Sequence, residues 1–270
     1  FASQILISEG PVKYWQEQGY TTSTDGTNDV LHEFYDPDNK IIIEHGQFKE
    51  KNEQCNRYMQ HMKHNTDYIW NLDSDEIFKP DDIELIIRIL KEHKFTSVGF
   101  KSLSFYGGFD HYLTGFEEDA EFHRIRKVYP GSYWSTHRPP TIAHRVLPTL
   151  QELHLPYNIL AEYGVRMYHY SYVFPKQVSQ KVQYYKAAVS LDNCIDDYYE
   201  KVYDPWVTHP DRREEIEKEW EGVHEFKPKY RGPCYTTKFK GTHPPKIQEN
   251  IDSLKDKLNN QLKAVWYENL

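Results

Sequence analysis

A short apolar segment that ends in three carboxylates constrains the fold of this chain more than any other feature. Residues 68–72, Tyr-Ile-Trp-Asn-Leu, are rich in aromatic and β-branched side chains and predict a buried strand. Asp73, Asp75 and Glu76 follow at once. Carboxylates at the carboxyl end of a strand lie where open α/β sheets bind their ligands. The one-residue spacing lets Asp73 and Asp75 bind one Mg²⁺ or Mn²⁺ ion, although the same pattern also occurs in solvated loops.

Strands and helices alternate on both sides of this acidic turn. Pro80 and two acids open a helix directly after it, with apolar residues at helical spacing over 83–90. The other predicted strands cover residues 3–8, 40–45, 97–105, 122–127 and 163–172. A further helix is predicted to begin after the capping cluster 23–29. Four more predicted helices cover 49–64, 175–191, 211–220 and 247–266. Loops or irregular structure are predicted for 110–121, 133–140 and 227–246. This order predicts an α/β fold with a mostly parallel sheet flanked by helices.

The composition excludes some classes of protein. A net charge of −8 argues against a protein that binds nucleic acid by neutralising phosphates. The three cysteines, Cys55, Cys194 and Cys234, are far apart, which is typical of free thiols in a reducing compartment. No apolar run is long enough to span a bilayer and no signal peptide is recognisable, so we expect a soluble cytoplasmic protein without a transmembrane segment. Because residue 1 is Phe1 and not Met, it stays open whether a further strand precedes it. The 22 tyrosines fit either sugar-stacking surfaces or tyrosine-rich packing.

Several motifs occur in an order that resembles a known family. Residues 5–10 are Ile-Leu-Ile-Ser-Glu-Gly, 23–27 are Ser-Thr-Asp-Gly-Thr, 51–56 are Lys-Asn-Glu-Gln-Cys-Asn, and 72–76 are Leu-Asp-Ser-Asp-Glu. Together they resemble the nucleotide-sugar half of GT-A glycosyltransferases, especially the large family 2 of inverting enzymes. The resemblance covers about the first third of the chain, and the combined order is far more specific than any one motif. Two departures are that the usual first strand is absent and that residues 11–22 are inserted before the Ser-Thr-Asp-Gly-Thr turn.

The resemblance implies a set of residues that bind the nucleotide-sugar donor. Glu9 corresponds to the contact with the nucleoside, and Asp25 to the turn aspartate, for which a helix cap is the alternative role. Asn56, with Gln54 or Lys51, is implied to lie near the base or ribose. The metal and, through it, the diphosphate are assigned to Asp73 and Asp75, with His169 of a late strand as a third metal ligand. The implied cofactor is therefore Mn²⁺ or Mg²⁺.

A second group of candidate residues concerns the acceptor and the catalytic base. An inverting transferase needs a carboxylate that accepts the proton of the attacking hydroxyl, and the acidic cluster at 117–121 is the natural place for it. We name Asp119 as this base, with Glu117, Glu118 and Glu121 as alternatives. Residues 122–127 resemble the family's Arg-x-x-Arg-Lys strand, so Arg126 is implied to hold the diphosphate or an anionic acceptor. His243, in a Gly-x-His-Pro-like segment, is implied to contact the diphosphate or the acceptor.

Together these features predict a GT-A-like (Rossmann-like) catalytic domain over 1–190 and a helical or irregular C-terminal extension over 191–270 that packs on it. The implied activity is that of a hexosyltransferase-like enzyme, which moves a sugar from a nucleotide diphosphate sugar to a hydroxyl acceptor, such as a glycan, with inversion. Two alternatives stay open. A nucleotidyltransferase would share the acidic metal turn, although no Gly-rich phosphate loop is visible, and a non-catalytic sugar- or nucleotide-binding protein would share the fold.

Overall fold

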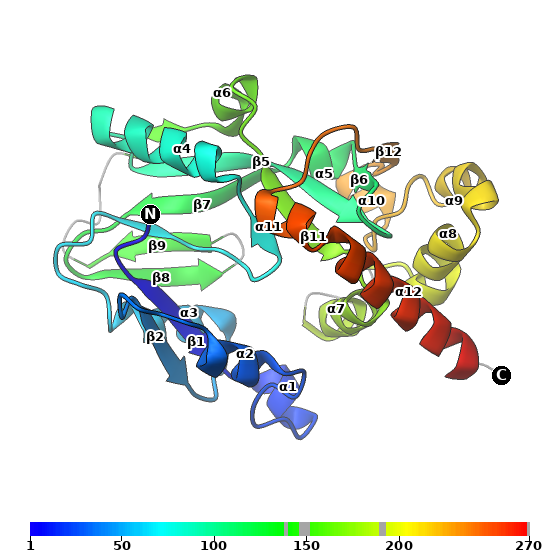
Figure 1. Cartoon of the computed structure of the whole chain (residues 1–270), viewed down its shortest axis with the longest axis horizontal. Helices are drawn as coiled ribbons and strands as arrows, with labels where there is room; N and C mark the ends of the chain where they lie inside the picture. Colours follow the sequence, from blue (N-terminus) through cyan, green and yellow to red (C-terminus); the bar gives the residue numbers. More distant parts are fainter. Residues whose placement is uncertain (138–139, 146–151, 189–192, 269–270) are drawn as a thin grey trace. The chain divides into compact units, whose positions relative to one another are not determined.

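The computed structural model describes residues 1–137, 140–145, 152–188 and 193–268, and Figure 1 shows the course of the chain. The chain divides into two compact units. Unit 1 consists of Phe1–Asn71, Leu90–Val98 and His123–Leu155, and unit 2 consists of Leu72–Ile89, Gly99–Phe122 and Pro156–Leu270. Residues distant in the sequence therefore share a unit, and the acidic turn belongs to unit 2.

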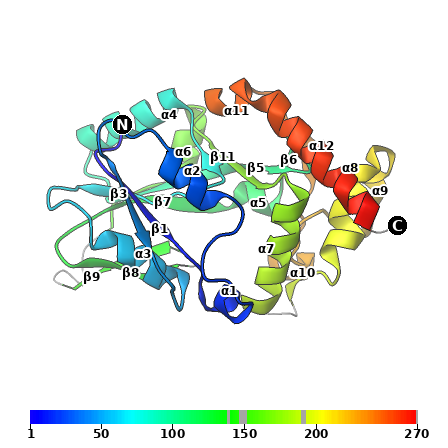
Figure 2. The same ribbon diagram turned by 60° about the horizontal axis from the view of Figure 1, so that its bottom comes forward.

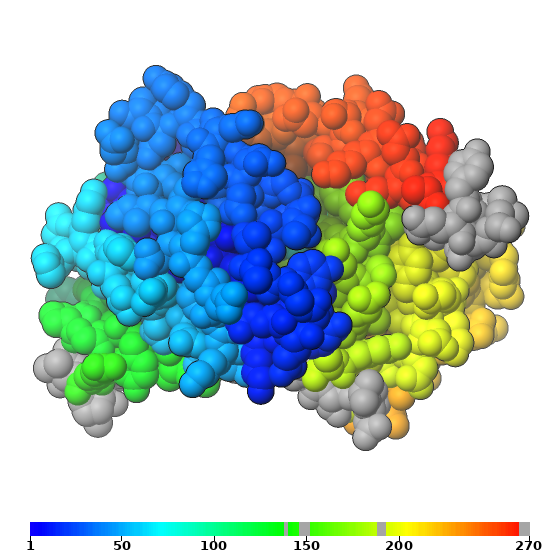
Figure 3. Space-filling model, turned by 90° about the horizontal axis from the view of Figure 1, so that it is seen from below, coloured from blue at the N-terminus to red at the C-terminus, as the bar shows by residue number. Residues whose placement is uncertain are grey.

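Unit 1 is built from strand pairs and short helices. β1 (Ile5–Glu9) pairs in parallel with β2 (Ile41–His45), which places Glu9 opposite His45. β3 (Tyr68–Trp70) runs antiparallel to β7 (Glu121–Lys127). β8 (Ser132–His137) and β9 (Pro140–His144) form a hairpin. The remaining elements are α1 (Lys13–Glu17), α2 (Thr27–Glu33), α3 (Lys51–Met59) and β10 (His154–Leu155). The N-terminal residues, blue in Figure 3, contribute to the surface of this unit.

Unit 2 contains a mixed sheet, so the expectation of a mostly parallel sheet is wrong. The strand order is β12 (Thr236–Lys238), β6 (His111–Leu113), β5 (Ser97–Tyr106), β11 (Met167–Tyr172) and β4 (Glu76–Ile77). β5 and β11 are parallel, whereas β4, β6 and β12 run antiparallel to their neighbours. Gly107 and Gly108, at φ 61° and 147°, turn the chain back after β5, a conformation that L-residues rarely adopt. The turn therefore makes β6 antiparallel instead of leading into a crossover helix.

The helices of unit 2 come mainly from the C-terminal half. α4 (Pro80–Glu92) begins directly after the acidic turn, as expected. α12 (Ile251–Glu268) packs against α7 (Pro175–Ala188), as Figure 2 shows. The shorter helices are α5 (Phe116–Asp119), α6 (Tyr157–Glu162), a π-helix (Tyr199–Tyr203), α8 (Asp204–Thr208), a 3₁₀ turn (Pro210–Arg212), α9 (Arg213–Glu219), α10 (Pro228–Arg231) and α11 (Pro245–Glu249). Among the described residues, no helix combines the length and the apolar content needed to cross a membrane.

Buried tyrosines form much of the core of unit 2. Tyr106 of β5 contacts Trp206 edge-on, with ring centroids 4.9 Å apart. Its hydroxyl lies 3.0 Å from that of Tyr198, which donates to the Val223 carbonyl at 2.6 Å. Because a buried hydroxyl needs a hydrogen-bond partner, these pairs stabilise the packing. Packing, and not sugar stacking, therefore accounts for these tyrosines, and the C-terminal extension shares a core with β5.

Several other expectations about local structure need correction. The predicted loop over 110–121 contains β6 and α5, and the predicted loop over 133–140 forms most of the β8–β9 hairpin, with residues 138–139 outside the described part. α3 ends at Met59, five residues before the predicted end of that helix, and the C-terminal helix is interrupted between α11 and α12. The short strands were missed because their polar and aromatic residues lack a clear two-residue alternation. The domain division at residue 190 stays a prediction.

Candidate functional site

The acidic turn in unit 2 is closed by reciprocal hydrogen bonds. The Glu76 amide donates to the Asp73 carbonyl at 3.1 Å, and the Asp73 amide donates to Glu76 Oε2 at 3.2 Å. Glu76 is buried, whereas Asp73 and Asp75 are partly exposed. The third acid therefore shapes the turn, whereas the first and second acids remain partly exposed.

Strand pairing brings a histidine from far along the chain to this turn. β4 pairs with β11 so that Glu76 lies opposite His169, and the Tyr170 amide donates to the Asp75 carbonyl at 2.9 Å. His169 Nε2 consequently lies 3.7 Å from Asp75 Oδ1. The neighbouring Tyr168 and Tyr170 point to the other face of the strand, where they pack with Phe105. The structure thus brings together Asp75 and His169, two residues that the sequence predicted to share one site.

A glutamine that no sequence motif singles out also contacts Asp75. Gln177 of α7 donates through Nε2 to Asp75 Oδ2 at 3.2 Å. Its Oε1 is buried and accepts no hydrogen bond from the described residues. A glutamine in an amphipathic helix is typically a surface residue, so only the structure identifies it.

A buried polar cluster contacts the Nδ1 side of the His169 ring. Ser104 Oγ of β5 lies 3.3 Å from His169 Nδ1 and donates to Glu117 Oε1 at 2.8 Å. The other carboxylate oxygen of Glu117 lies 3.7 Å from His224 Nε2. Burial raises the pKa of Glu117, but its pairing with His224, the nearby His169 and the hydrogen bond from Ser104 outweigh burial and lower the pKa to about 2. Glu117 is therefore ionised at neutral pH and accepts hydrogen bonds only.

The Asp75 and His169 pair fits a divalent cation. Asp75 Oδ1 and His169 Nε2 approach to 3.7 Å, and their side chains are 26% and 12% exposed, so both ligand atoms lie in a partly enclosed site. A carboxylate oxygen together with an imidazole nitrogen suits Mn²⁺. Asp73, two residues earlier in the same turn, is the further carboxylate that the sequence associates with this metal.

The carboxylates at 117–121 have different surroundings. Glu117 belongs to the buried cluster, Glu118 pairs with Lys101 Nζ at 3.2 Å, and Glu121 Oε1 accepts the Tyr157 amide at 2.8 Å. Asp119 is exposed at the end of α5. Of the four candidate bases, Asp119 is therefore the most accessible to a bound acceptor.

In unit 1, Glu9 is buried at the carboxyl end of β1. Its carboxylate accepts the Ser23 amide at 2.9 Å and contacts His45 Nδ1 at 2.9 Å. Burial raises the pKa of Glu9, but the hydrogen bonds with Ser23 and His45 lower it by a larger amount. The net shift of the pKa is therefore downward. Glu9 thus joins β1, β2 and the Ser-Thr-Asp-Gly-Thr turn, and holds a negative charge at the strand ends.

The other donor residues of unit 1 also have structural partners. Asp25 Oδ1 accepts the Thr27 amide at 3.1 Å and the Thr27 hydroxyl at 2.6 Å, so it binds the first residue of α2, whose N-cap is Gly26. Asn56 exchanges two 2.8 Å hydrogen bonds with the backbone of Trp134 in β8. Gln54 donates to the Ser8 carbonyl at 2.9 Å. Lys51 opens α3 and is partly exposed.

The remaining predicted residues are also engaged within their own units. Arg126 Nη1 in unit 1 donates to Glu152 Oε1 at 2.6 Å, and Arg124 is buried. His243 in unit 2 lies 3.1 Å from the Phe109 carbonyl through Nε2 and 2.9 Å from the Tyr170 hydroxyl through Nδ1. Because a carbonyl only accepts, Nε2 carries the proton and Nδ1 accepts from Tyr170. Burial lowers the pKa of His243, so the histidine is neutral in this position.

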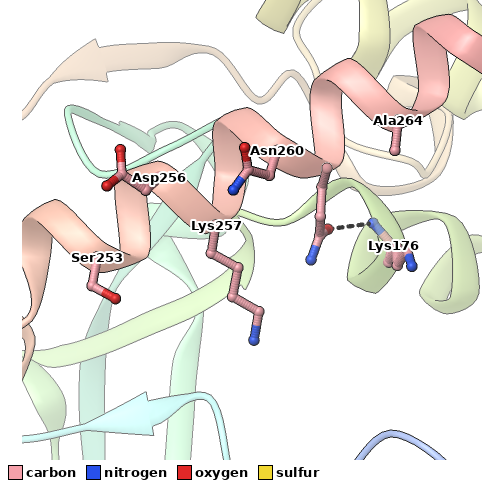
Figure 4. Close-up of a pocket in the computed structure, with 7 residues that line it drawn as sticks. Lys176, Ser253, Asp256, Lys257, Asn260 and Ala264 are labelled. Carbon is pink, nitrogen blue, oxygen red and sulfur yellow. Dashed lines mark hydrogen bonds between the residues drawn. The ribbon is translucent and has the colours of Figure 1, made fainter.

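A cavity of about 440 Å³ lies elsewhere in unit 2, and Figure 4 shows the residues that line it. Lys176 of α7 and residues of α12 line it, and the Lys176 amide donates to Gln261 Oε1 at 3.2 Å. None of the predicted site residues lines this cavity. It is therefore separate from the Asp75 and His169 pair.

Comparison with known proteins identifies the family. The model of "Glycosyl transferase family 2" matches residues 21–144, a range that includes Asp25, Asp73, Asp75 and Asp119 but excludes Glu9, His169 and His243. A search of curated proteins found no match. The family transfers sugars from nucleotide sugars and implies the GT-A fold, which favours a transferase over a nucleotidyltransferase or a non-catalytic binding protein. With its acidic turn inside the matched range, the chain carries a glycosyltransferase family 2 domain over residues 21–144 and is a glycosyltransferase.

Proposed function

We propose that this enzyme is a metal-dependent glycosyltransferase that moves a sugar from a nucleotide diphosphate sugar to a hydroxyl of a glycan acceptor, with inversion. The observation that carries the proposal is the close approach of Asp75 Oδ1, in the turn before β4, and His169 Nε2 of β11, two ligand atoms 3.7 Å apart. Asp73, Asp75 and His169 would hold Mn²⁺ or Mg²⁺. When bound, the ion would counter the negative charge on the diphosphate leaving group.

The residues of the chain have distinct roles in the proposed reaction. Asp119 accepts the proton of the attacking acceptor hydroxyl, whose oxygen forms the new bond to the anomeric carbon. The bond from that carbon to the diphosphate oxygen breaks on the opposite face, and the nucleoside diphosphate leaves with the bonding electrons. Inversion follows from this single displacement. Asp119 suits the role because it is the exposed member of its cluster.

Donor recognition in this proposal belongs to the residues implied by the family resemblance. The assigned side chains are those of Glu9, Asp25, Lys51, Asn56 and Arg126, with His243 assigned to the diphosphate or the acceptor. Lys51 and Asp25 are the more accessible members, because Glu9 is buried and both amide atoms of Asn56 bond to Trp134. Glu9 and Asn56 are therefore proposed to act by shaping the donor site as well as by direct contact.

The proposal is tested by following release of nucleoside diphosphate from a panel of nucleotide sugars with Mn²⁺, with and without a chelator. We expect turnover that requires the metal and falls at least about 100-fold in Asp75→Ala, since an interaction made with developing charge is lost. Asp110→Ala is the matched control, because Asp110 is an exposed aspartate of the same unit, 3.7 Å from Lys255. Metal-independent turnover, or equal activity of Asp75→Ala and wild type, would contradict the proposal.

A further inference from the structure

The hydroxyl of Ser104 is the junction of a buried hydrogen-bond network in unit 2. Its oxygen lies 2.8 Å from Ser102 Oγ, 2.8 Å from Glu117 Oε1 and 3.3 Å from His169 Nδ1. Ser102 and Ser104 are fully buried in β5, and Glu117 is buried in α5. No water is needed to complete this arrangement, because three protein groups surround the one hydroxyl.

The position of each proton in the network follows from its chemistry. A serine hydroxyl has one hydrogen to donate and two lone pairs to accept with. Ser104 donates its one hydrogen to Glu117 Oε1. With that hydrogen used, Ser104 can only accept in its contacts with Ser102 Oγ and His169 Nδ1, so each of these two groups donates. His169 therefore carries a proton on Nδ1.

The opposite side of the imidazole faces Asp75. His169 Nε2 lies 3.7 Å from Asp75 Oδ1, while Gln177 occupies the other oxygen of that carboxylate. In the Nδ1–H tautomer, the Nε2 lone pair of His169 points at an anionic oxygen. Two acceptors at this separation repel each other unless a cation lies between them.

We propose that Ser104 and Glu117 are positioning residues that hold His169 in the Nδ1–H tautomer, with Nε2 free to bind the metal beside Asp75. The proposal rests on the metal site of the proposed function. In metalloproteins a ligating histidine commonly donates its other N–H to a carboxylate or carbonyl, which orients the ring and makes the ligand nitrogen more basic. Here the serine hydroxyl relays that interaction from the carboxylate to the ring.

His224 extends the support one step further. Its Nε2 lies 3.7 Å from Glu117 Oε2, and its Nδ1 lies 3.1 Å from Glu225 Oε2. Tyr172 also donates to Glu225, at 2.5 Å. The C-terminal extension therefore places the His224 imidazole next to the Glu117 carboxylate to which Ser104 donates.

The tautomer is tested without metal and without turnover. Nitrogen-15 NMR distinguishes protonated from unprotonated ring nitrogens, and the His169→Gln variant identifies the His169 signals by their loss. In the metal-free wild type we expect a protonated Nδ1 and an unprotonated Nε2. In Ser104→Ala we expect a mixture that contains the Nε2–H form. Ser171→Ala is the matched control, because Ser171 is a buried serine of β11 whose hydroxyl contacts Lys181 and not His169.

Mn²⁺ titration by calorimetry supplies the second measurement. Ser104→Ala should weaken Mn²⁺ binding about tenfold, in the range found for groups that orient a metal ligand, and Ser171→Ala should leave it unchanged. An Nε2–H or doubly protonated His169 in the wild type would overturn the positioning proposal, as would unchanged Mn²⁺ affinity in Ser104→Ala. By contrast, a wild type that binds no Mn²⁺ but shows the Nδ1–H form would refute the metal site of the proposed function and leave the tautomer assignment standing.

Discussion

Replacing Glu117 by glutamine removes one negative charge from the buried cluster while preserving the shape of the side chain. Wild-type Glu117 has a pKa of about 2 in the folded protein, against 4.5 ordinarily. A carboxyl group whose pKa is lowered by folding stabilises the folded state above its unfolded pKa, and that contribution is lost as the pH falls through the folded pKa. The stabilisation from this group is therefore complete above about pH 5 and disappears toward pH 2.

The magnitude follows from the two pKa values. A pKa that falls from 4.5 to about 2 corresponds to about 3 kcal/mol of stability at pH 7. The same relation leaves about 1.4 kcal/mol at pH 3, because the unfolded carboxyl group is protonated there and the folded one remains mostly ionised. Glu117→Gln should thus be less stable than wild type by about 3 kcal/mol at pH 7, and the difference should roughly halve by pH 3.

Urea unfolding of both proteins, followed by circular dichroism at pH 7, 5, 4 and 3, measures this difference. Glu118→Gln is the control, because its neighbouring carboxylate is 31% exposed and pairs with Lys101 near the surface. Such a pair contributes about 0.2–1 kcal/mol, so the control should be nearly as stable as wild type at every pH. A Glu117→Gln deficit that stays constant from pH 7 to pH 3 would refute the electrostatic reasoning.

Three further variants test the packing around the site. Asn56→Ala removes both 2.8 Å hydrogen bonds to Trp134, and leaves partly buried backbone groups unpaired, so the free energy of unfolding should fall by about 1–3 kcal/mol in a urea titration. Gly222→Ala places a Cβ 2.0 Å from the Cys234 carbonyl oxygen at φ 121°, and a lower thermal midpoint should report strain of at least about 1–3 kcal/mol. Tyr198→Phe loses the hydrogen bond to the Val223 carbonyl, so the free energy of unfolding should fall by about 1 kcal/mol and thermal unfolding should show a lower midpoint. An unchanged midpoint would count against a role for this hydroxyl in the core.

Local patterns predicted many elements because their signals lie within a few residues. Apolar spacing and the proline at its start predicted α4, and β-branched runs predicted β1 and β2. The direction of strand pairing was predicted wrongly, since it depends on partners far along the chain. β4 pairs antiparallel with β11, a strand far along the chain, whereas β6 is antiparallel to β5 because of the turn at Gly107.

The amino-acid order alone identified the acidic turn and its likeness to family 2, because Asp73 and Asp75 are chemically specific and adjacent to a strand and a helix. It also suggested His169, through the family resemblance. The roles of Ser104, Glu117 and Gln177 emerged only from the folded chain. No sequence pattern marks a buried serine or glutamate as functional. The role of such a residue depends on the neighbouring groups with which it forms hydrogen bonds. Those neighbours come from β5, α5, α7 and β11, and only tertiary packing brings them within hydrogen-bonding distance.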